Sequence, residues 1–407
     1  MTRKAGGSHR GRLHTRRGSV ASLGRWIRVL PPAARASHSA LLSRNLCSEP
    51  MVRIVYGVSG EGAGHASRAR AVLTHLEERG HRVKVVSYDR GCELLREDFD
   101  VFETEGLHLA SVENKVSVVR TFTDNLCRLT GGVARLRGLR QTCFREFEPE
   151  CVITDFEPMT AHLANHHGLP LLTIDNQHRM RYMAYPRVPR LAADALVTEA
   201  VIRAIVPRPD YSLVTTFYRG EVENERTMLV PPVLRSEVRD VRPERGEHVL
   251  VYFTHSFDRF HEHLLACSRE RFIVYGARRE GAEANLQFKT PSQSGFLEDF
   301  AGARAVVATA GFSLITEALH LGKPYLALPM RGQFEQELNA VMLETIGCGA
   351  NGREARRESL GDFLYRLPDY ERALVDYPRD EGNRELFERL DELLADDCRE
   401  ARALHRG

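Results

Sequence analysis

Apolar and polar positions alternate along most of the chain in a pattern of short buried strands and amphipathic helices that begins at Met51. The apolar residues 52–58 predict a first strand, and residues 66–79 have the periodicity of a helix. Further strands are predicted at residues 83–86, 151–154 and 170–174, with helices at 91–97 and 159–167. Strands that alternate with helices predict a parallel sheet covered by helices on both faces.

A proline pair interrupts this alternation near the middle of the chain. Pro231 and Pro232 break both strand and helix, and the alternation restarts with strands at 249–254 and 272–275. We therefore predict an α/β protein of two doubly wound, Rossmann-like domains that face each other across a cleft, residues 51–230 and 235–384. We expect a C-terminal helix over residues 385–407 to cross back to the first domain. Ligands of such sheets bind beyond the carboxyl ends of the strands.

The first fifty residues differ from the rest in charge. They contain ten Lys and Arg but a single acid, Glu49, so residues 51–407 hold 47 bases and 54 acids. Three hypotheses fit residues 1–50: a disordered basic tail, an Arg-rich organelle presequence, and translated sequence upstream of the true start. We favour a tail without a fold. The mildly acidic remainder argues against nucleic-acid binding.

The overall composition is typical of a soluble globular protein, with 43% hydrophobic and 28% charged residues among 407. No apolar run approaches the roughly 20 residues that cross a bilayer. The eight cysteines form no CxxC pair, so we predict reduced thiols, a cytoplasmic location and no zinc site. Residues 115–148 combine an apolar helical stripe with the arginines at 128, 135, 137, 140 and 145. A packed helix with a solvated face is the favoured interpretation, and contact with a membrane surface is the alternative.

The segment with the most chemical information lies between the apolar residues 305–308 and the segment 322–329. Its glycine turn at Gly311 opens a short predicted helix. Unpaired N–H groups and the helix dipole favour an anion at such a helix start, and a glycine without Cβ lets the anion approach closely. Glu317 lies one turn further along, where its carboxylate would accept hydrogen bonds from sugar hydroxyls. The pattern predicts a nucleotide site, although an ordinary strand-to-helix turn would explain the glycine alone.

A second glycine turn, residues 59–65, follows the first strand and opens the first helix, which is the context expected for binding a phosphate or a sugar. Gly60 and Gly62 fit the first two positions of a dinucleotide fingerprint. His65 occupies the third position, where its bulk would obstruct helix–strand packing. A histidine at a helix N-terminus beside a cleft is a candidate base or a donor to an anion. A structural histidine is the alternative.

The two turns together resemble those of GT-B glycosyltransferases. The similarity is greatest to family 28, typified by the N-acetylglucosaminyltransferase that makes lipid II, and to related bacterial and archaeal proteins. It covers about residues 51–350 in order and spacing. The motifs that carry it are Gly60–His65, Gly311–Glu317, Gly322–Pro324 and Gln333–Asn339. The C-terminal motifs are specific as a block, whereas the N-terminal turn alone is not.

The resemblance implies that residues 235–384 bind a nucleotide-sugar donor. The diphosphate would be held by the backbone of Ala310, Gly311, Phe312 and Ser313, with a further contact from Ser256. Glu317 would bind the ribose, and the backbone near Phe296 and Leu297 would pair with the base, usually uracil. Gln333, Glu335 and Gln336 would contact the hydroxyls of the donor sugar. Family 28 enzymes carry a His and an Asp just before the paired glutamines, an arrangement that Gly332 and Phe334 interrupt in this chain. The resemblance therefore does not identify the donor sugar.

Glycosyl transfer needs a base for the acceptor hydroxyl and positive potential for the leaving diphosphate. His65 is the first candidate base. Asp155 and Glu157 directly follow a predicted strand and are further candidates, although such carboxylates also serve as helix N-caps. The loop residues expected near an acceptor or a phosphate are Gly62, Gly64, Asn176 and His178. The resemblance implies inversion without a metal, and the D-x-D at residues 98–100 lies near no other motif.

We therefore predict a cytoplasmic glycosyltransferase that moves a hexosyl or N-acetylhexosaminyl group from a nucleotide-diphosphate sugar, with UDP as the expected nucleotide, to an acceptor hydroxyl. The donor is a co-substrate, and no cofactor or nucleic-acid partner is expected. A lipid-linked sugar, a polysaccharide and a small metabolite all fit as acceptor, and peripheral contact with a membrane stays open. The alternatives are a nucleotide-sugar 2-epimerase, a non-catalytic nucleotide-sugar sensor and an NAD-dependent oxidoreductase, the last disfavoured by His65.

Overall fold

The computed structural model describes residues 51–106, 111–112, 115–116, 129–253, 258–277, 279–290, 293–330, 332–353, 357–379 and 383–406. The chain divides into two units, residues 1–48 and 49–407, and the account below concerns the second. The three hypotheses for residues 1–50 lie outside the described residues. So do residues 117–128 of the arginine-decorated segment, which continues as the helix α4 (Leu129–Leu139) and the π-helical turn η1 (Arg140–Glu146).

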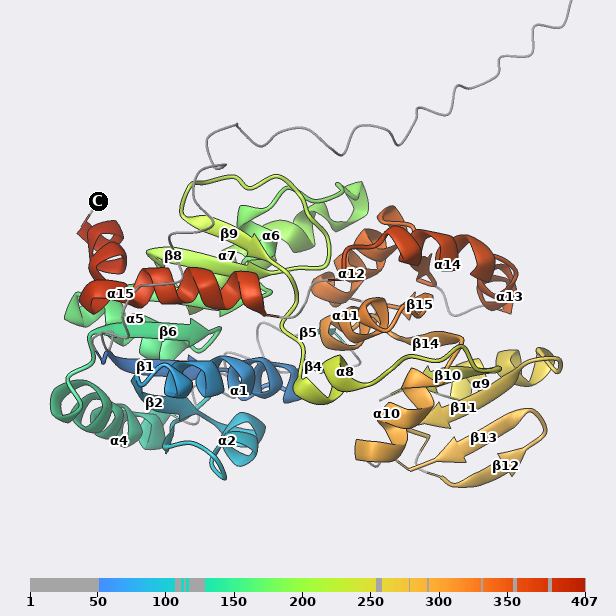
Figure 1. The fold of residues 1–407 in the computed structure, drawn as a ribbon, viewed down its shortest axis with the longest axis horizontal. Helices are drawn as coiled ribbons and strands as arrows, with labels where there is room; N and C mark the ends of the chain where they lie inside the picture. The colour runs from blue at the N-terminus through green and yellow to red at the C-terminus, as the bar shows by residue number, and fades with distance from the viewer. Residues whose placement is uncertain are drawn as a thin grey trace, which may run out of the picture. The chain divides into compact units, whose positions relative to one another are not determined.

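The N-terminal lobe is built on a parallel sheet of seven strands in the order β3-β2-β1-β6-β7-β8-β9 (Figure 1). Its strands are β1 (Arg53–Val58), β2 (Arg82–Ser87), β3 (Val101–Glu103), β6 (Cys151–Asp155), β7 (Leu171–Asp175), β8 (Tyr211–Thr215) and β9 (Thr227–Val230). Its helices, besides α4 and η1, are α1 (Ala63–Glu78), α2 (Asp89–Leu95), α5 (Pro158–His167), α6 (Arg179–Tyr182), η2 (Pro189–Leu191) and α7 (Ala192–Ile205). The short strands β4 (Ser111–Val112) and β5 (Lys115–Val116) pair with each other.

The C-terminal lobe repeats this architecture in the order β12-β13-β11-β10-β14-β15-β16, parallel except for the β12–β13 pair. Its strands are β10 (His248–Tyr252), β11 (Arg271–Tyr275), β12 (Gly281–Glu283), β13 (Leu286–Lys289), β14 (Ala305–Thr309), β15 (Tyr325–Leu328) and β16 (Gly349–Asn351). Its helices are α8 (Ser236–Asp240), α9 (Asp258–Ala266), α10 (Gln293–Ala301), α11 (Phe312–His320), α12 (Phe334–Thr345), α13 (Arg357–Tyr365) and α14 (Leu367–Asp376). The predicted class of two doubly wound, parallel-sheet domains is confirmed.

The central strands are mostly apolar because helices cover both faces of each sheet. All five residues of β6 and of β7 are buried, as are four of the five in β14. In both lobes the switch in strand order places the carboxyl ends of the first strand and its new neighbour side by side: β1 beside β6, and β10 beside β14. Those ends are where ligands of doubly wound sheets bind.

The last helix, α15 (Arg384–Arg406), packs on the N-terminal lobe although it follows the C-terminal one in sequence (Figure 1). Its leucines, among them Leu390 and Leu393, share an apolar cluster with β1 residues such as Ile54. The ring of Phe387 stacks on His75 of α1 at 4.0 Å between centroids. The C-terminal helix therefore ties the end of the chain to the lobe that contains the first glycine turn.

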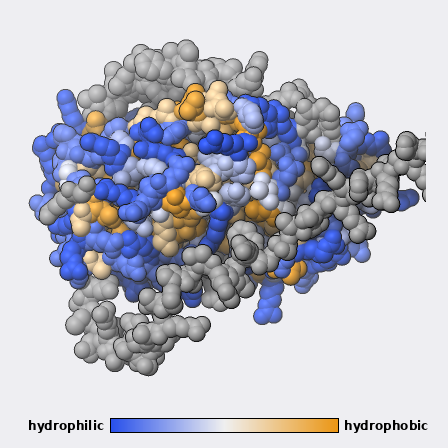
Figure 2. Space-filling model, turned by 90° about the horizontal axis from the view of Figure 1, so that it is seen from above, coloured by the Kyte–Doolittle hydropathy of each residue, from blue (hydrophilic) through white to orange (hydrophobic). Residues whose placement is uncertain are grey.

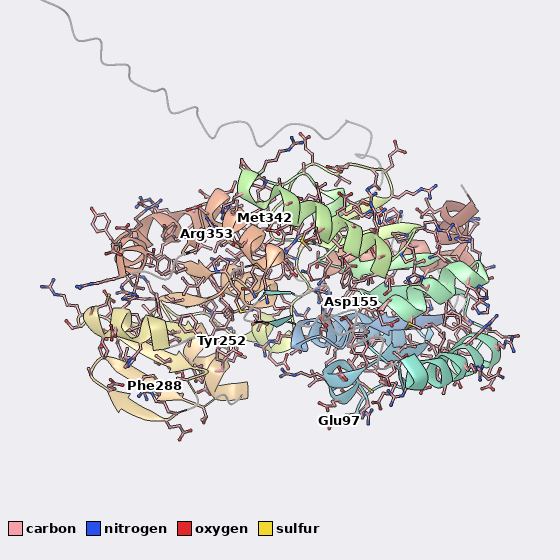
Figure 3. All side chains as sticks on the ribbon, turned by 180° about the vertical axis from the view of Figure 1, so that it is seen from behind. Glu97, Asp155, Tyr252, Phe288, Met342 and Arg353 are labelled. Atoms are coloured by element: carbon pink, nitrogen blue, oxygen red, sulfur yellow. The ribbon has the colours of Figure 1, made fainter. Side chains whose placement is uncertain are left out.

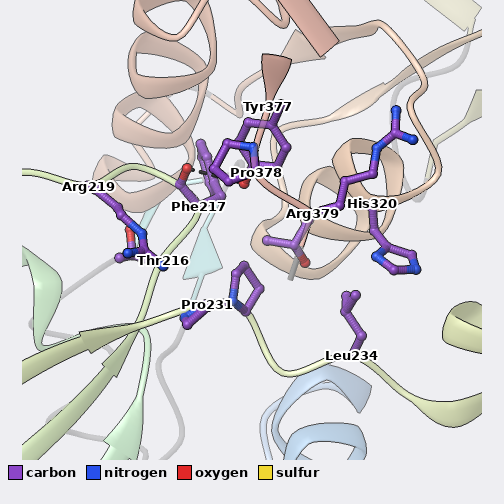
Figure 4. Close-up of a pocket in the computed structure, with 11 residues that line it drawn as sticks. Thr216, Phe217, Arg219, Pro231, Leu234, His320, Tyr377, Pro378 and Arg379 are labelled. Carbon is purple, nitrogen blue, oxygen red and sulfur yellow. Dashed lines mark hydrogen bonds between the residues drawn. The ribbon is translucent and has the colours of Figure 1, made fainter. Parts of the chain in front are cut away.

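Two chain segments cross between the lobes and are bonded to each other. The backbone N–H of Leu234 donates to Oδ1 of Asn383 at 3.2 Å, and Nδ2 of Asn383 lies 3.4 Å from the carbonyl oxygen of Leu234. Beside them a cavity of about 50 Å³ is lined by Pro231 and Leu234 of the first crossing and by Tyr377 and Arg379 of the second (Figure 4). The proline segment predicted as a linker is thus one of the two crossings.

The surface is mostly hydrophilic with interspersed apolar residues, as one face shows in Figure 2. The helix α7 exposes Leu196 and Val197, whose side chains are 69% and 54% accessible. Within the described ranges, no helix combines the length and hydropathy needed to cross a membrane.

Candidate active site

The first glycine turn places His65 at the start of α1. Gly62 adopts φ 85° as the residue before the helix, a conformation that side chains other than glycine rarely take. Gly64 meets the C-terminal lobe directly, since a Cβ at this position would lie 2.7 Å from Oγ of Ser313. The two turns singled out in the sequence therefore touch each other across the lobes.

His65 is paired with Asp155, the last residue of β6. The two side chains meet with Nδ1 and Oδ1 2.7 Å apart, and Asp155 is fully buried (Figure 3). A carboxylate only accepts hydrogen bonds, so in a neutral His65 ring Nδ1 carries the proton and Nε2 has the lone pair. The side chain of His65 is 13% accessible, with Nε2 3.5 Å from Nε2 of Gln177. This is the arrangement of an oriented general base.

Arg68, one turn further along α1, holds the other side of the same carboxylate. Its Nε and Nη2 donate to the two oxygens of Asp155 at 2.8 and 2.6 Å. Its Nη1 donates to Oδ1 of Asn176 at 3.1 Å. With both oxygens occupied and no exposed surface, the carboxylate of Asp155 is placed to orient His65 rather than to contact a substrate. It is a positioning residue in this geometry, not the free base that the strand-end position suggested.

Glu157 does not reach the space between the lobes. Its side chain is buried, and its carboxylate accepts the backbone N–H groups of Met159 and Thr160 at 2.8 and 2.7 Å, which caps α5. Burial raises the pKa of this carboxyl group. The catalytic role predicted for Glu157 is therefore not supported by its position, and helix capping explains why an acid follows the strand here.

A second His–carboxylate pair follows β7. His178 donates its backbone N–H to Oδ1 of Asp175 at 2.8 Å, and its Nδ1 lies 2.7 Å from Oδ2. Burial works against ionisation of Asp175, but the charge and hydrogen bonds of His178 outweigh it and lower the pKa of this carboxyl group. Both side chains are fully buried. The side chain of His178 is therefore not exposed to the space between the lobes. Asn176, which lies between Asp175 and His178 in the sequence, contacts Glu335 of the other lobe.

The glycine turn at Gly311 in the C-terminal lobe has the predicted strand–turn–helix form. Gly311 precedes α11 with φ −70°, and no side chain caps the helix start. A Cβ at Gly311 would meet no atom within 4 Å, so the space beside this turn is open. Ala310 is buried and its carbonyl accepts Nδ2 of Asn339 at 2.9 Å. The turn can therefore offer N–H groups to an anion, as its sequence predicted.

A cavity of about 1080 Å³ adjoins this turn and lies between α1 and the C-terminal lobe. Of the predicted residues, Gly64, Phe296, Ser313 and Glu317 line it. Tyr252 lies at the carboxyl end of β10 (labelled in Figure 3). Phe296 packs edge-on against it, with ring centroids 5.5 Å apart. These two rings form an aromatic wall of the cavity.

Glu317 faces the cavity but is held by a residue that the sequence did not single out. Nε and Nη2 of Arg235 donate to its two oxygens at 2.8 and 3.2 Å. An ionised carboxylate has about four acceptor positions, so two stay open for hydroxyl groups. Arg235 lies in the first crossing between the lobes, just before α8, and thereby joins that crossing to the predicted ribose site.

The glutamine-rich segment contributes a contact across the lobes. Oε1 of Glu335 accepts from Nδ2 of Asn176 at 2.7 Å, whereas Gln333 and Gln336 hydrogen-bond to each other at 2.6 Å. Leu297 packs against the apolar core of its lobe and does not line the large cavity. Ser256 lies outside the described residues.

Arg68, Arg235 and Asn339 are among the site residues that sequence reasoning missed. Arg68 had a signal, because it lies one helical turn after His65 and so shares its face of α1. Asn339 ends the motif that carried the resemblance. Arg235 had none, because its partner Glu317 is 82 residues away.

Comparisons with known proteins agree with this geometry. The family model described as glycosyl transferase family 1 matches residues 52–368. An uncharacterized glycosyltransferase of Methanosarcina acetivorans is 25% identical over 333 residues, which cover 73% of this chain and 85% of that protein. The solved glycosyltransferase of kitacinnamycin aligns with a TM-score of 0.64 at 17% identity, covering 84% of this chain and 99% of that one.

A second solved structure, the spinosyn rhamnosyltransferase SpnG complexed with thymidine diphosphate, aligns with a TM-score of 0.55 at 13% identity, over 84% of this chain and 100% of that one. The predicted similarity to GT-B glycosyltransferases is confirmed, and the matching family model is that of family 1, whereas the motifs had suggested family 28. The chain belongs to glycosyl transferase family 1 and is a glycosyltransferase of the GT-B fold.

Proposed function

We propose that this glycosyltransferase transfers a hexosyl group from a nucleotide-diphosphate sugar to an acceptor hydroxyl by direct displacement, with inversion and without a metal. The observation that carries the proposal is the His65–Asp155 pair, 2.7 Å apart, next to the contact between Gly64 and Ser313. An oriented base from one lobe thus lies beside the phosphate turn of the other.

The chemistry assigned to these groups is simple. Nε2 of His65 takes the proton of the acceptor hydroxyl as its oxygen attacks the anomeric carbon. The bond from that carbon to the diphosphate oxygen breaks, and the electron pair leaves with the diphosphate. Unpaired N–H groups at the start of α11 stabilise the charge that develops there. A single displacement of this kind inverts the anomeric configuration.

The nucleotide is proposed to be uridine or thymidine diphosphate. The resemblance in the motifs points to uracil, and the structurally similar spinosyn rhamnosyltransferase SpnG is complexed with thymidine diphosphate. Glu317 has free acceptor positions in the cavity for the ribose hydroxyls. The Phe296 and Tyr252 rings offer an apolar wall for a base.

The test is release of nucleoside diphosphate by the purified full-length chain from a panel of UDP- and TDP-hexoses, with and without candidate acceptors and with EDTA. The product anomer is assigned by NMR. His65→Ala should lower kcat about 10²- to 10⁴-fold and leave nucleotide affinity within about twofold. The matched control is His162→Ala, an exposed histidine of the same lobe that bonds only the Ala204 carbonyl among described groups.

Two results would contradict the proposal. One is turnover by His65→Ala at the wild-type rate, which removes the assigned base. The other is the absence of binding and turnover with every donor of the panel by a folded wild-type protein. Release that stops in EDTA and returns with a divalent metal would contradict the metal-independent step alone.

A further inference from the structure

Arg179 begins α6 in the N-terminal lobe, but its guanidinium group lies among residues of the C-terminal lobe. Its Nη2 donates to Oδ1 of Asn339 at 2.6 Å and lies 3.3 Å from Oε1 of Glu335. Its Cζ is 4.7 Å from the ring centroid of Phe312, the first residue of α11. The side chain has no accessible surface.

The hydrogen-bonding capacity of this arginine is only partly used. Among the described residues, neither Nε nor Nη1 finds an acceptor, and both atoms are buried. Burial lowers the pKa of Arg179 to about 10, which still leaves it charged at neutral pH. The nearest carboxylate, Glu335, is 3.3 Å away and also accepts from Asn176. Burying a cation with two N–H groups that have no acceptor costs folding free energy unless an anion binds to them.

The position of the guanidinium group indicates which anion. Asn339 bonds both Arg179 and the carbonyl of Ala310, so a chain of two hydrogen bonds connects the arginine to the turn that opens α11. The same Nη2 atom lies 3.3 Å from Oε1 of Glu335 in the first turn of α12, within the segment expected to contact the donor sugar. The arginine therefore lies between the turn for the diphosphate and the segment for the sugar.

We propose that Arg179 binds the β-phosphate of the donor and stabilises the leaving diphosphate, so that the acceptor lobe supplies a cation to the donor's reacting end. The inference rests on the proposed function. As the bond between the anomeric carbon and the β-phosphate oxygen breaks, its electron pair passes to that oxygen. The planar guanidinium group has an open N–H on each of two edges, at Nε and at Nη1, and one of them can donate a charge-assisted hydrogen bond to a phosphate that gains charge. The acceptor proton goes to His65 as before.

The proposal makes the β-phosphate the feature that Arg179 recognises. A nucleoside monophosphate lacks this group and should bind through base, ribose and α-phosphate alone. The ratio of diphosphate to monophosphate affinity therefore isolates the contribution of the arginine from its structural contacts. A residue that merely links the lobes would affect both ligands alike.

The experiment measures binding of UMP, UDP, TMP and TDP by calorimetry to the full chain and to Arg179→Met, which keeps length and loses every donor. We expect the diphosphate-to-monophosphate affinity ratio to fall about ten- to a hundredfold, the range for charge-assisted hydrogen bonds. We expect kcat for donor turnover to fall by at least as much. Arg179→Lys keeps the charge without the planar guanidinium group and should recover part of both.

The matched control is Arg190→Met. Arg190 also comes from the N-terminal lobe and also reaches α12, where its Nη2 lies 2.9 Å from Oε2 of Glu337, but its side chain is 31% accessible. This variant loses a link between the lobes and should keep the wild-type affinity ratio.

The outcomes separate the two proposals. If wild type prefers diphosphates and Arg179→Met keeps that preference, the role of Arg179 is overturned and the proposed function stands. If the wild-type protein binds no nucleotide, both the proposed role of Arg179 and the proposed function are overturned. Should Arg179→Met not fold, the same ratio in Arg179→Lys decides, since an unchanged ratio there overturns the inference.

Discussion

Replacement of Asp155 by Asn tests the core of the proposed site, because this one side chain serves two partners. It is fully buried and accepts from Nδ1 of His65 at 2.7 Å and from Arg68 at 2.8 and 2.6 Å. Asparagine has nearly the same shape but no charge, and its amide nitrogen would face donors. Asp155→Asn keeps a single acceptor oxygen, so one of the donors of His65 and Arg68 faces the amide nitrogen, and both residues lose the negative charge.

The structure predicts two effects of different size. Arg68 is 5% accessible, so removal of its counter-charge leaves a buried cation and should cost about 3–5 kcal/mol of unfolding free energy. His65 loses the group that fixes its tautomer and stabilises its protonated form. Because general base catalysis contributes about 10²- to 10⁴-fold, kcat should fall within that range while nucleotide affinity changes little.

The assay combines urea unfolding with the rate of nucleoside diphosphate release by the folded fraction. His65→Ala, Asp155→Asn and the double variant are compared as a cycle. If Asp155 acts only through His65, then Asp155→Asn adds nothing to the activity loss of His65→Ala. Losses that multiply, or a folded Asp155→Asn with wild-type kcat, would refute the reasoning.

Three further predictions follow from single contacts. Glu317→Ala should weaken UDP binding at least tenfold by calorimetry with an unfolding free energy within about 1 kcal/mol of wild type; unchanged affinity would exclude Glu317 from the ribose site. Glu157→Ala should cost about 1–2 kcal/mol through loss of the α5 cap and leave kcat within about twofold, whereas a large kcat loss at unchanged stability would restore its catalytic role. Burial lowers the pKa of Lys323 from 10.5 to about 8. The unfolded state thus binds more protons between these values, and stability should rise by about 3 kcal/mol as pH increases through that window. Lys323→Met should flatten this rise, and a wild-type profile in the variant would contradict the assignment.

The fold was predictable because its signals are local and repeated. Strands β1, β6 and β14 are continuous apolar runs bounded by glycine or polar turns, and they lie within about one residue of their predicted limits. The sequence did not reveal β16, because Gly349, Ala350 and Asn351 have weak strand propensity and pair only through their neighbour β15.

The candidate site was predictable to the extent that single turns define it. His65 and Ser313 were predicted because each lies at a turn that its glycines mark in the sequence. The structure brings those two turns into contact. Glu157 shows the limit of this reasoning. A carboxylate after a buried strand can face a ligand or cap the next helix, and only the direction of its side chain separates the two.

The contacts between the lobes depend on distant residues, and this explains why they escape sequence reasoning. Asn176 and Glu335 are separated by 159 positions, and Arg179 and Asn339 by 160. Each is an ordinary polar residue in its own segment, since no local period or turn marks it. Its chemistry arises only when the carboxyl ends of the two sheets come together. Because each lobe has its own glycine turn, the part of the candidate site that each lobe contributes can be predicted from a short stretch of sequence. Arg179, which we assign to the leaving group, is part of the N-terminal lobe in sequence, but its guanidinium group contacts residues of the C-terminal lobe. Its role therefore depends on how the two lobes pack together.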